Sequence, residues 1–461
     1  MAYQAYVTKL VNVRKHPNAD RLVLGDCFGN TVCVSNDHQE GETGVYFPTD
    51  GQLSEEFATL NDLVRRKDAA GNNCGGYMDP NKRNVTSIRL RGEPSDGLFL
   101  PLRCLDYCFK DEAEKHLKVG DVIDVLNGHE ICRKYIPVRK NMAGQPNSAK
   151  KQAKKIKAAF APLFTEHVDT AQLAYNLNAF KPGDILNISI KNHGTSQRTG
   201  YLPKFTGEYD YANMFVALVA KILRGKARDS FNAAFGKPHY EYGYVTGTRR
   251  TVLESAHGGF YGSNQFRLDH AQEFEGKLHK GETVYYEVVG FTDSGAPIMG
   301  SVENSKTQDK DFIKKYGKTT TFSYGCDPAG ENGLPQSDIY VYRMTMTNVD
   351  GDVVEYTPEY MAYRCEQMGV KTVQTVWKGI LPEADSENLG LFVKEKAEEF
   401  YDGADPVGKT HVREGVVIRV VNRPKFTAYK HKNFSFKVLE GIAKVNADAP
   451  DMEEAEEVEE G

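Results

Sequence analysis

Short apolar runs, each bounded by Gly, Asn, Asp or Pro, recur through the first part of this chain. The runs are "AYVTKLVNV", "RLVLGDCF", "TVCVSN", "TGVYFP", "SIRLRGEPSDGLFLPL" and "VGDVIDVL". Runs of this length are typical of short β-strands joined by tight turns. Because such strands bury their apolar faces only by pairing with one another, a small antiparallel barrel or sandwich is expected.

The pattern becomes mixed after residue 160. A helix is expected over residues 211–225, and strands are expected over 184–190, 282–291, 338–348, 413–421 and 434–439. This mixture favours an α+β fold with antiparallel sheets and helices. We predict an OB-like β-barrel over residues 1–130, a basic linker or helix over 131–160, an α+β domain over 161–446 and an acidic disordered tail over 447–461.

Charge is unevenly distributed along the chain. Residues 448–461 hold eight acids and no base, so the net charge of −5 becomes +3 without them. Residues 133–157 hold nine Lys or Arg and no acid. Such a block can hold a phosphate backbone, or it can be a solvated linker, and the sequence leaves both explanations open.

Composition narrows the class of protein. With 461 residues, of which 40% are apolar, the chain is long enough for two or three globular domains. It has no run of eighteen apolar residues and no signal-peptide layout at its start, so we expect a cytoplasmic protein without a membrane partner. We also expect a monomer. Its eight cysteines form no Cys-x-x-Cys pair, which argues against zinc or a disulfide framework.

The stretch "DILNISIKNHGTSQRTG", residues 184–200, places Lys191 at the end of a strand-like alternation. Gly194 follows three residues later and permits a tight turn, because glycine has no Cβ. A lysine at the mouth of a pocket is a candidate nucleophile. A surface lysine before an ordinary turn is the alternative.

Three later strands place an ionisable side chain among apolar neighbours. Glu287 lies in "VYYEVVGF", Glu414 opens "EGVVI" and Lys437 interrupts "FSFKVLE". A charge in such a strand is costly unless it is paired, binds a metal or faces a cavity, and a structural ion pair would explain any one of them. With Lys191 they describe a pocket of two lysines and two carboxylates, which suits a nucleoside triphosphate and its metal ion.

These motifs, in this order, resemble those of the covalent nucleotidyltransferases, the superfamily of ATP-dependent ligases and mRNA capping enzymes. The matching stretches are Lys191-Asn-His-Gly-Thr-Ser, "YYEVVGF", "YVYRM", "EGVVI" and "FSFKVLE". Histidine at position 193 is similar to the motif of RNA ligases, because DNA ligases and capping enzymes more usually carry Asp at this position. The N-terminal "VRKHPNADRLVLG", "GETGVYFPTDGQLSEE" and "IRLRGEPSDGLFLPL" resemble the OB module of the RNA ligase 5 type. The resemblance implies that an ATP-grasp-like ligase domain follows this module.

The resemblance further implies an ATP-dependent RNA ligase with ATP and Mg²⁺ or Mn²⁺ as cofactors. Lys191 would form a lysyl-AMP, and its AMP would pass to an RNA 5′-phosphate, which an RNA 3′-hydroxyl would then attack. The RNA partner would present both ends in a duplex or at a nick. The implied catalytic residues are Lys191, Glu414, which also binds the metal, and Lys437. The implied nucleotide-binding residues are His193, Gly194, Ser196, Arg249, Arg250, Glu287 on the ribose and Tyr342 on the adenine.

One motif departs from the family pattern. The last motif is usually Lys-x-Lys, whereas here it is Ser435-Phe436-Lys437. The missing role could pass to Lys430 or Lys432, or the site could be weakened. Two alternatives remain. An mRNA guanylyltransferase would use the same lysine with GTP, and the missing motif lysine would suit a nucleic-acid-binding protein with a decayed transferase site. The retained Lys191, Glu287, Glu414 and Lys437 weigh against decay.

Overall fold

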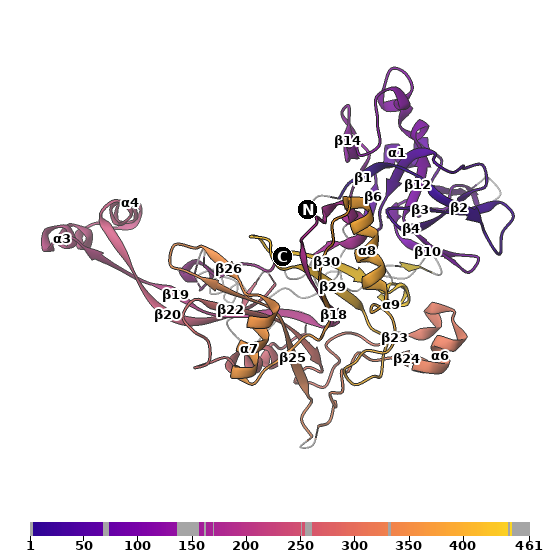
Figure 1. Cartoon of the computed structure of the whole chain (residues 1–461). Helices are drawn as coiled ribbons and strands as arrows, with labels where there is room; N and C mark the ends of the chain where they lie inside the picture. Colours follow the sequence, from indigo (N-terminus) through magenta and orange to yellow (C-terminus); the bar gives the residue numbers. More distant parts are fainter. Residues whose placement is uncertain are drawn as a thin grey trace.

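Strands dominate the fold, and most of them pair antiparallel (Figure 1). The computed structural model describes residues 3–67, 73–135, 156–160, 163–168, 170–249, 251–253, 261–330, 333–440 and 443–444. Arg250, most of the basic stretch 133–157 and the whole predicted tail 447–461 lie outside the described residues. Among the described helices, none has the length and apolar character that crossing a bilayer requires.

The N-terminal region, residues 3–135, forms several small sheets. The three main sheets have the strand orders β12-β5-β1-β13, β2-β3-β4 and β16-β6-β9. Each of the six expected runs carries at least one strand. The elements are β1 Ala5–Lys9, β2 Val11–Lys15, β3 Leu22–Cys27, β4 Asn30–Ser35, β5 Thr43–Phe47, β6 Gly51–Leu53, α1 Glu55–Leu60, β7 Arg65–Lys67, β8 Asn73–Gly75, β9 Asn84–Val85, β10 Ser87–Leu90, β11 Glu93–Asp96, β12 Leu98–Pro101, β13 Val122–Ile123, β14 Val125–Leu126, β15 His129–Glu130 and β16 Cys132–Lys134.

No closed barrel is found among the described residues of this region. Closure requires every strand to pair on both sides, yet the order β12-β5-β1-β13 is open at both ends in the described chain. β13 contributes only two residue pairs to β1. The mixed α+β class is confirmed, whereas the OB-like barrel is not.

Two larger sheets form the rest of the molecule. One has the order β17-β30-β29-β18-β28, and the other has the order β21-β20-β19-β22-β25-β26, with β27 also pairing β25. Their strands are β17 Ala171–Gln172, β18 Ile185–Lys191, β19 Thr195–Tyr211, β20 Gly236–Thr248, β21 Val252–Leu253, β22 Glu282–Gly290, β25 Ser337–Thr347, β26 Val353–Glu355, β27 Lys371–Thr372, β28 Thr375–Ile380, β29 Gly415–Val420 and β30 Thr427–Lys432. The expected strands at 184–190, 282–291, 338–348 and 413–421 are confirmed.

Helices and short strands surround these sheets. They are α3 Met214–Ile222, α4 Gly225–Phe235, α5 Gln265–Gln272, β23 Val302–Glu303, α6 Lys310–Tyr316, β24 Thr319–Thr320, α7 Pro358–Met368, α8 Ser386–Glu398, α9 Phe434–Glu440 and β31 Ala443–Lys444. The strand expected over 434–439 is wrong, because α9 occupies these residues. Asn433 explains the difference, since its Oδ1 accepts a hydrogen bond from the Phe436 amide at 3.1 Å and so caps the helix.

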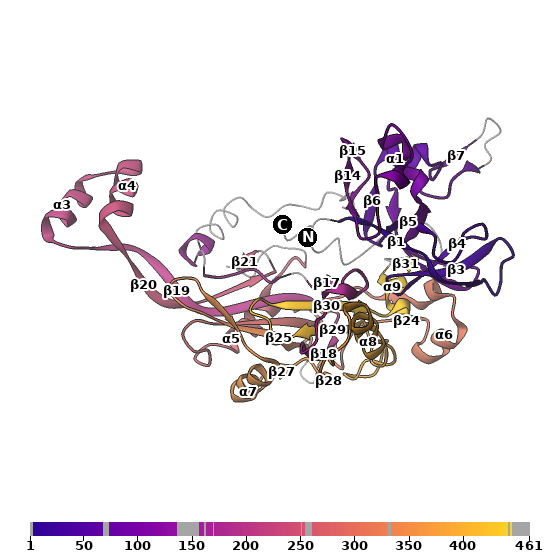
Figure 2. The same cartoon turned by 45° about the horizontal axis from the view of Figure 1, so that its top comes forward.

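β19 and β20 continue beyond the sheet as a long two-stranded arm that carries α3 and α4 at its tip (Figures 1 and 2). The helix expected over 211–225 is confirmed in its central part, while Tyr211 still belongs to β19. Gln197 pairs with Thr248 across the arm. The arm therefore returns the chain to its base beside Arg249 and accounts for the long sequence between Lys191 and Arg249.

The N-terminal region contacts the rest of the molecule through side chains and through one pair of strands. Asp96 Oδ2 lies 3.3 Å from Lys437 Nζ on α9. The hydroxyls of Thr49 and Tyr175 lie 2.9 Å apart. Because β31 also pairs parallel with β10, α9 and the segment after it are held against the N-terminal region.

Candidate active site

Lys191 ends β18 next to the start of β29. The register pairs Lys191 with Gly415, so Glu414 lies beside the lysine, with 2.7 Å between Nζ and Oε1. Glu414 is fully buried, and the Lys191 side chain is 19% exposed. A Cβ at Gly415 would lie 2.1 Å from the His431 carbonyl oxygen, so only glycine lets β29 and β30 pair this closely. The backbone therefore fixes the position of Glu414.

Gly194 lies between Lys191 and the start of β19. A Cβ at this residue would lie 2.4 Å from the Val288 carbonyl oxygen on β22. We expected this glycine to permit a tight turn, and the structure adds a close approach of two segments as the reason for it.

One pocket collects most of the predicted nucleotide-binding residues. Its lining includes Lys191, Gly194, Ser196, Arg249, Glu287 and Tyr342. Ser196 on β19 pairs with Glu287 on β22, and the Ser196 Oγ lies 2.7 Å from the Tyr342 hydroxyl. Burial, followed by the charge of Glu287, raises the pKa of Tyr342, so the phenol is neutral near pH 7. Three strands of one sheet thus present these groups to one space.

Aromatic side chains that the sequence reading missed complete the wall near Tyr342. The His167 ring lies 5.0 Å from the Tyr342 ring and 6.0 Å from the Phe426 ring, measured between centroids. Both His167 and Phe426 line the pocket. Burial, followed by the charge of Arg343, lowers the pKa of His167 well below its usual value, so its ring is uncharged. Flat, uncharged rings of this kind can pack against a planar base.

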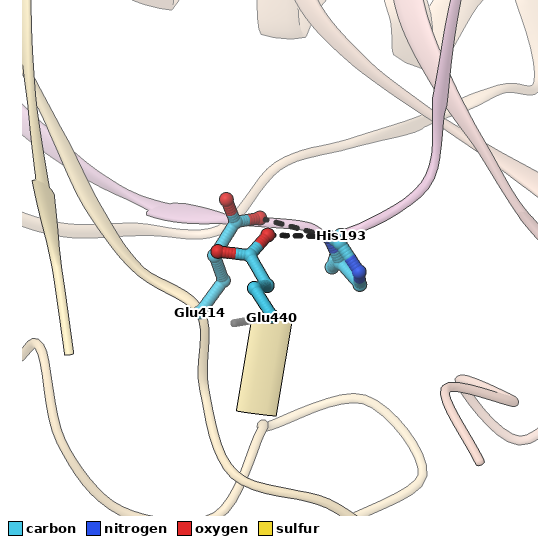
Figure 3. A group of neighbouring side chains, drawn as sticks. All are labelled: His193, Glu414 and Glu440. Atoms are coloured by element: carbon cyan, nitrogen blue, oxygen red, sulfur yellow. Dashed lines mark ion pairs between the residues drawn. The ribbon is translucent and has the colours of Figure 1, made fainter. Parts of the chain in front are cut away.

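Lys432 and Glu440 enlarge the charged cluster around Glu414. Lys432 Nζ lies 3.2 Å from Glu414 Oε1 and 3.0 Å from Glu440 Oε2. His193 Nδ1 lies 3.5 Å from Glu440 Oε1 and 3.8 Å from Glu414 Oε2 (Figure 3). All four of these side chains are nearly fully buried, whereas Lys191, which also contacts Glu414, is partly exposed. Buried charges of this number are tolerated only when they are mutually paired.

His193, Glu414 and Glu440 could also hold a metal ion. One ligand atom from each lies within 4.8 Å of the others (Figure 3). Carboxylate oxygens suit Mg²⁺ and Mn²⁺, and imidazole is compatible with Mn²⁺. The donor set therefore fits the predicted metal, although both lysine ammonium groups contact the same Glu414 oxygen.

Lys437 does not join this cluster. It lies on α9, where its ammonium contacts Asp96, and it is not part of the pocket lining. Lys430 lines the pocket instead, and Lys432 contacts Glu414. Lys430-His431-Lys432 on β30 has the Lys-x-Lys pattern that appeared to be missing at 435–437. This pattern was the sequence signal that could have identified both lysines.

Buried polar groups lie next to the segment that carries His193. The His193 amide donates to the Tyr324 hydroxyl at 2.5 Å. Burial, followed by the charge of Asp405, raises the pKa of Tyr324. Asp405 is fully buried, its Oδ2 has no partner among the described residues, and burial raises its pKa to about 7. The electrostatic influence of Glu414 adds to this rise.

Comparisons with known proteins identify the fold. No protein-family model and no curated protein sequence matches the chain. An RNA ligase of Naegleria gruberi solved with pyrophosphate matches at a TM-score of 0.50 and 15% identity, covering 94% of this chain and 97% of that chain. A mutant of that ligase with AMP and Mn matches at a TM-score of 0.51 and 14% identity, covering 94% of this chain and 97% of that chain. Another mutant, with ATP and Mn, matches at a TM-score of 0.50 and 15% identity, covering 96% of this chain and 99% of that chain. The chain therefore has the fold of an RNA ligase over most of its length.

Proposed function

We propose that this protein is an ATP-dependent RNA ligase of the RNA ligase 5 type. The observation that carries the proposal is the contact between Lys191 Nζ and Glu414 Oε1 at the wall of a pocket that Ser196, Glu287 and Tyr342 also line. The similar Naegleria gruberi structures, which contain ATP, AMP and Mn, support ATP and a divalent metal as its cofactors.

Lys191 is the proposed nucleophile. Its Nζ attacks the α-phosphorus of ATP, forming an N–P bond while the bond to pyrophosphate breaks. The AMP then passes to the 5′-phosphate oxygen of an RNA end, which releases Lys191. Attack by an RNA 3′-hydroxyl on that 5′-phosphorus forms the phosphodiester and releases AMP. Lys191 must lose its proton before the first step, and Glu414 Oε1, at 2.7 Å from Nζ, is in position to receive it.

The other residues of the pocket and of the charged cluster beside it bind and orient the nucleotide in this proposal. Glu287 accepts hydrogen bonds from the ribose hydroxyls, and Tyr342 with His167 packs against the adenine. Arg249, Lys430 and Lys432 offset phosphate charge, so Lys430-x-Lys432 takes the role that the sequence reading gave to Lys437. His193, Glu414 and Glu440 are the residues that would hold Mg²⁺ or Mn²⁺. A bound metal would neutralise negative charge on the α-phosphate.

The N-terminal region is proposed to be an OB-like module that engages RNA, with a duplex or a nick as the substrate. Its strands form open antiparallel sheets that contact α9, and α9 carries Glu440. This contact supports a role in binding RNA close to the site. We further propose that the protein acts as a cytoplasmic monomer.

Labelling with α-phosphate-labelled nucleotides tests the proposal. Incubation with ATP and Mn²⁺ should transfer label to the protein, whereas GTP should not. Preferential labelling by GTP would instead identify a guanylyltransferase. A folded protein that takes label from neither nucleotide would indicate a decayed site and refute the ligase assignment. Sealing of a nicked RNA duplex then tests the later steps.

A further inference from the structure

We propose that a cleft between the β10–β11 turn and α6 binds a phosphodiester of the RNA strand outside the nucleotide pocket. The inference rests on the proposed ligase function. The cleft is lined by Arg89, Arg91, Gly92, Thr307, Gln308, Asp309 and Lys310. β10 and α6, which contribute Arg89 and Lys310 to this lining, both lie at the right in Figure 1. Two regions distant in sequence therefore contribute cations to one space.

The charges that line the cleft favour an anion. Arg89, Arg91 and Lys310 supply three cations, and Asp309 is the single acid in the lining. Asp309 is already engaged, since its Oδ1 accepts hydrogen bonds from the amides of Asp311 at 2.9 Å and Phe312 at 3.0 Å. Like charges gathered around one space repel each other. A bound phosphate would offset this repulsion, because each of the three cations attracts it.

Arg89 is held in place with a donor remaining. Its guanidinium carbon lies 5.1 Å from the centre of the Phe434 ring, and its Nη1 donates to the Gly92 carbonyl oxygen at 3.1 Å. Its Nε is buried and has no hydrogen-bond partner among the described residues. The ring and the carbonyl oxygen together hold the guanidinium of Arg89 at the wall of the cleft.

The turn that carries Arg91 adopts an unusual conformation. Leu90 pairs with Glu93, so Arg91 and Gly92 form a two-residue turn, with φ angles of 45° and 97°. Asn, Asp or Gly is preferred at the first position, because a larger side chain costs about 1 kcal/mol in the left-handed region. Gln308 across the cleft also has a positive φ, at 53°. Formation of the turn therefore does not explain why position 91 is an arginine.

The N-terminal stretch "HPN" braces this turn. The Asn18 amide donates to His16 Nδ1 at 3.0 Å, so the proton of this imidazole is on Nε2, which donates to the Leu90 carbonyl oxygen at 3.1 Å. Asn18 Nδ2 donates to the Arg91 carbonyl oxygen at 2.9 Å. Both carbonyl groups around Arg91 are thus fixed, and so is the backbone from which its side chain extends beside the cleft.

An RNA phosphodiester fits this place better than a free phosphate ion. Phe434, beneath Arg89, begins α9, and Glu440 of the charged cluster ends the same helix. A strand held in the cleft therefore lies on an element that leads to the candidate active site. Phosphate contacts of this type fix the register of a nucleic acid without reading its bases.

Binding of a 5′-phosphorylated RNA by the full chain, measured in EDTA at several salt concentrations, tests the inference. Arg91→Ala and Lys310→Ala should each weaken binding and lower the slope of log affinity against log salt by about 0.7 to 0.9. The matched controls are Arg103→Ala in the N-terminal region and Lys314→Ala on α6, two exposed cations outside the cleft lining. The controls should bind RNA as the unmodified protein does.

Self-labelling with ATP separates this inference from the proposed function. All four variants should label normally, since none lies in the nucleotide pocket. Unchanged RNA affinity and salt slope in Arg91→Ala and Lys310→Ala would overturn the inference while leaving the ligase proposal intact. Loss of inorganic phosphate or pyrophosphate binding in these variants, with RNA binding unaffected, would also overturn it, because the cleft would then be a free-phosphate site.

Discussion

Lys191 and Lys432 share one carboxylate oxygen, Glu414 Oε1, which lies 2.7 Å from the first ammonium group and 3.2 Å from the second. The two lysines come from β18 and β30, on either side of β29. A single buried acid therefore organises both cations that the proposed chemistry requires. The following predictions test this arrangement.

Replacement of Lys191 by Ala should abolish covalent AMP formation, because no other atom would form the N–P bond. The adduct of the unmodified protein should be labile in acid and stable in base, as a phosphoramidate is. Gel detection of labelled protein after treatment at each pH provides the measurement. Lys204→Ala, an exposed lysine on β19, is the control and should label normally. Full labelling of Lys191→Ala would refute the assignment.

Replacement of Glu414 by Ala should lower self-adenylylation on the order of 100-fold or more. The change removes a buried carboxylate that pairs with two lysines and belongs to the possible metal group. Glu414→Gln keeps the shape and should lose nearly as much activity if the charge matters. Thermal unfolding of both variants checks that they fold. Activity within a few-fold of the original would mean that another group performs this role.

Lys432→Met and Lys437→Met should have different effects. Lys432→Met should sharply reduce self-adenylylation, whereas Lys437→Met should leave it within a few-fold, since Lys437 contacts Asp96 instead of the pocket. Lys432 is buried between two carboxylates, so its loss could cost about 3–5 kcal/mol of stability. Lys432→Arg keeps the charge and separates folding from chemistry. A greater loss in the Lys437 variant would restore the assignment made from the sequence.

As the pH rises from about 4 to about 7, the titration of Asp405 should lower the free energy of unfolding. Burial raises the pKa of Asp405 to about 7, so in this interval the folded protein retains a proton that the unfolded chain releases. The loss has a limiting slope of about 1.4 kcal/mol per pH unit. Relative to the original protein, Asp405→Asn should therefore become more stable as pH rises. Denaturant unfolding at pH 5 and pH 8 measures this, with the exposed Glu275→Gln as the control. The prediction would be contradicted if Asp405→Asn and the original protein differed in free energy of unfolding by the same amount at both pH values.

The sequence predicted the strands of the site well, because β18, β22, β25 and β29 each have long apolar runs whose pattern depends on local residues. It failed at α9, where "FSFKVL" also alternates like a strand. The deciding interaction was the cap from Asn433, a single hydrogen bond outside the run. This error also placed Lys437 wrongly, since the direction of a side chain depends on the element that carries it.

Residues contributed by tertiary contacts were beyond the reach of sequence patterns. Glu440 meets His193 only because α9 packs against the segment between β18 and β19, and His167 meets Tyr342 from a segment without periodicity. Of the arm, the sequence predicted only the helix at the tip, because that helix has an apolar run. The long pairing of β19 with β20 was not predicted, because it joins two segments that lie on either side of the tip in the sequence. The N-terminal strands were located correctly, but strand positions do not determine whether a sheet closes.

The strand order of the five-stranded sheet also has a consequence for the timing of activity during synthesis. Lys191 leaves the ribosome well before β29, which pairs with β18 in the finished sheet, and before β30, which pairs with β29. At about 5–20 residues per second, the nucleophile waits on the order of ten seconds or more for Glu414 and Lys432. A nascent chain released before residue 414 thus has the proposed attacking amine without Glu414 or Lys432, and we expect it not to form lysyl-AMP.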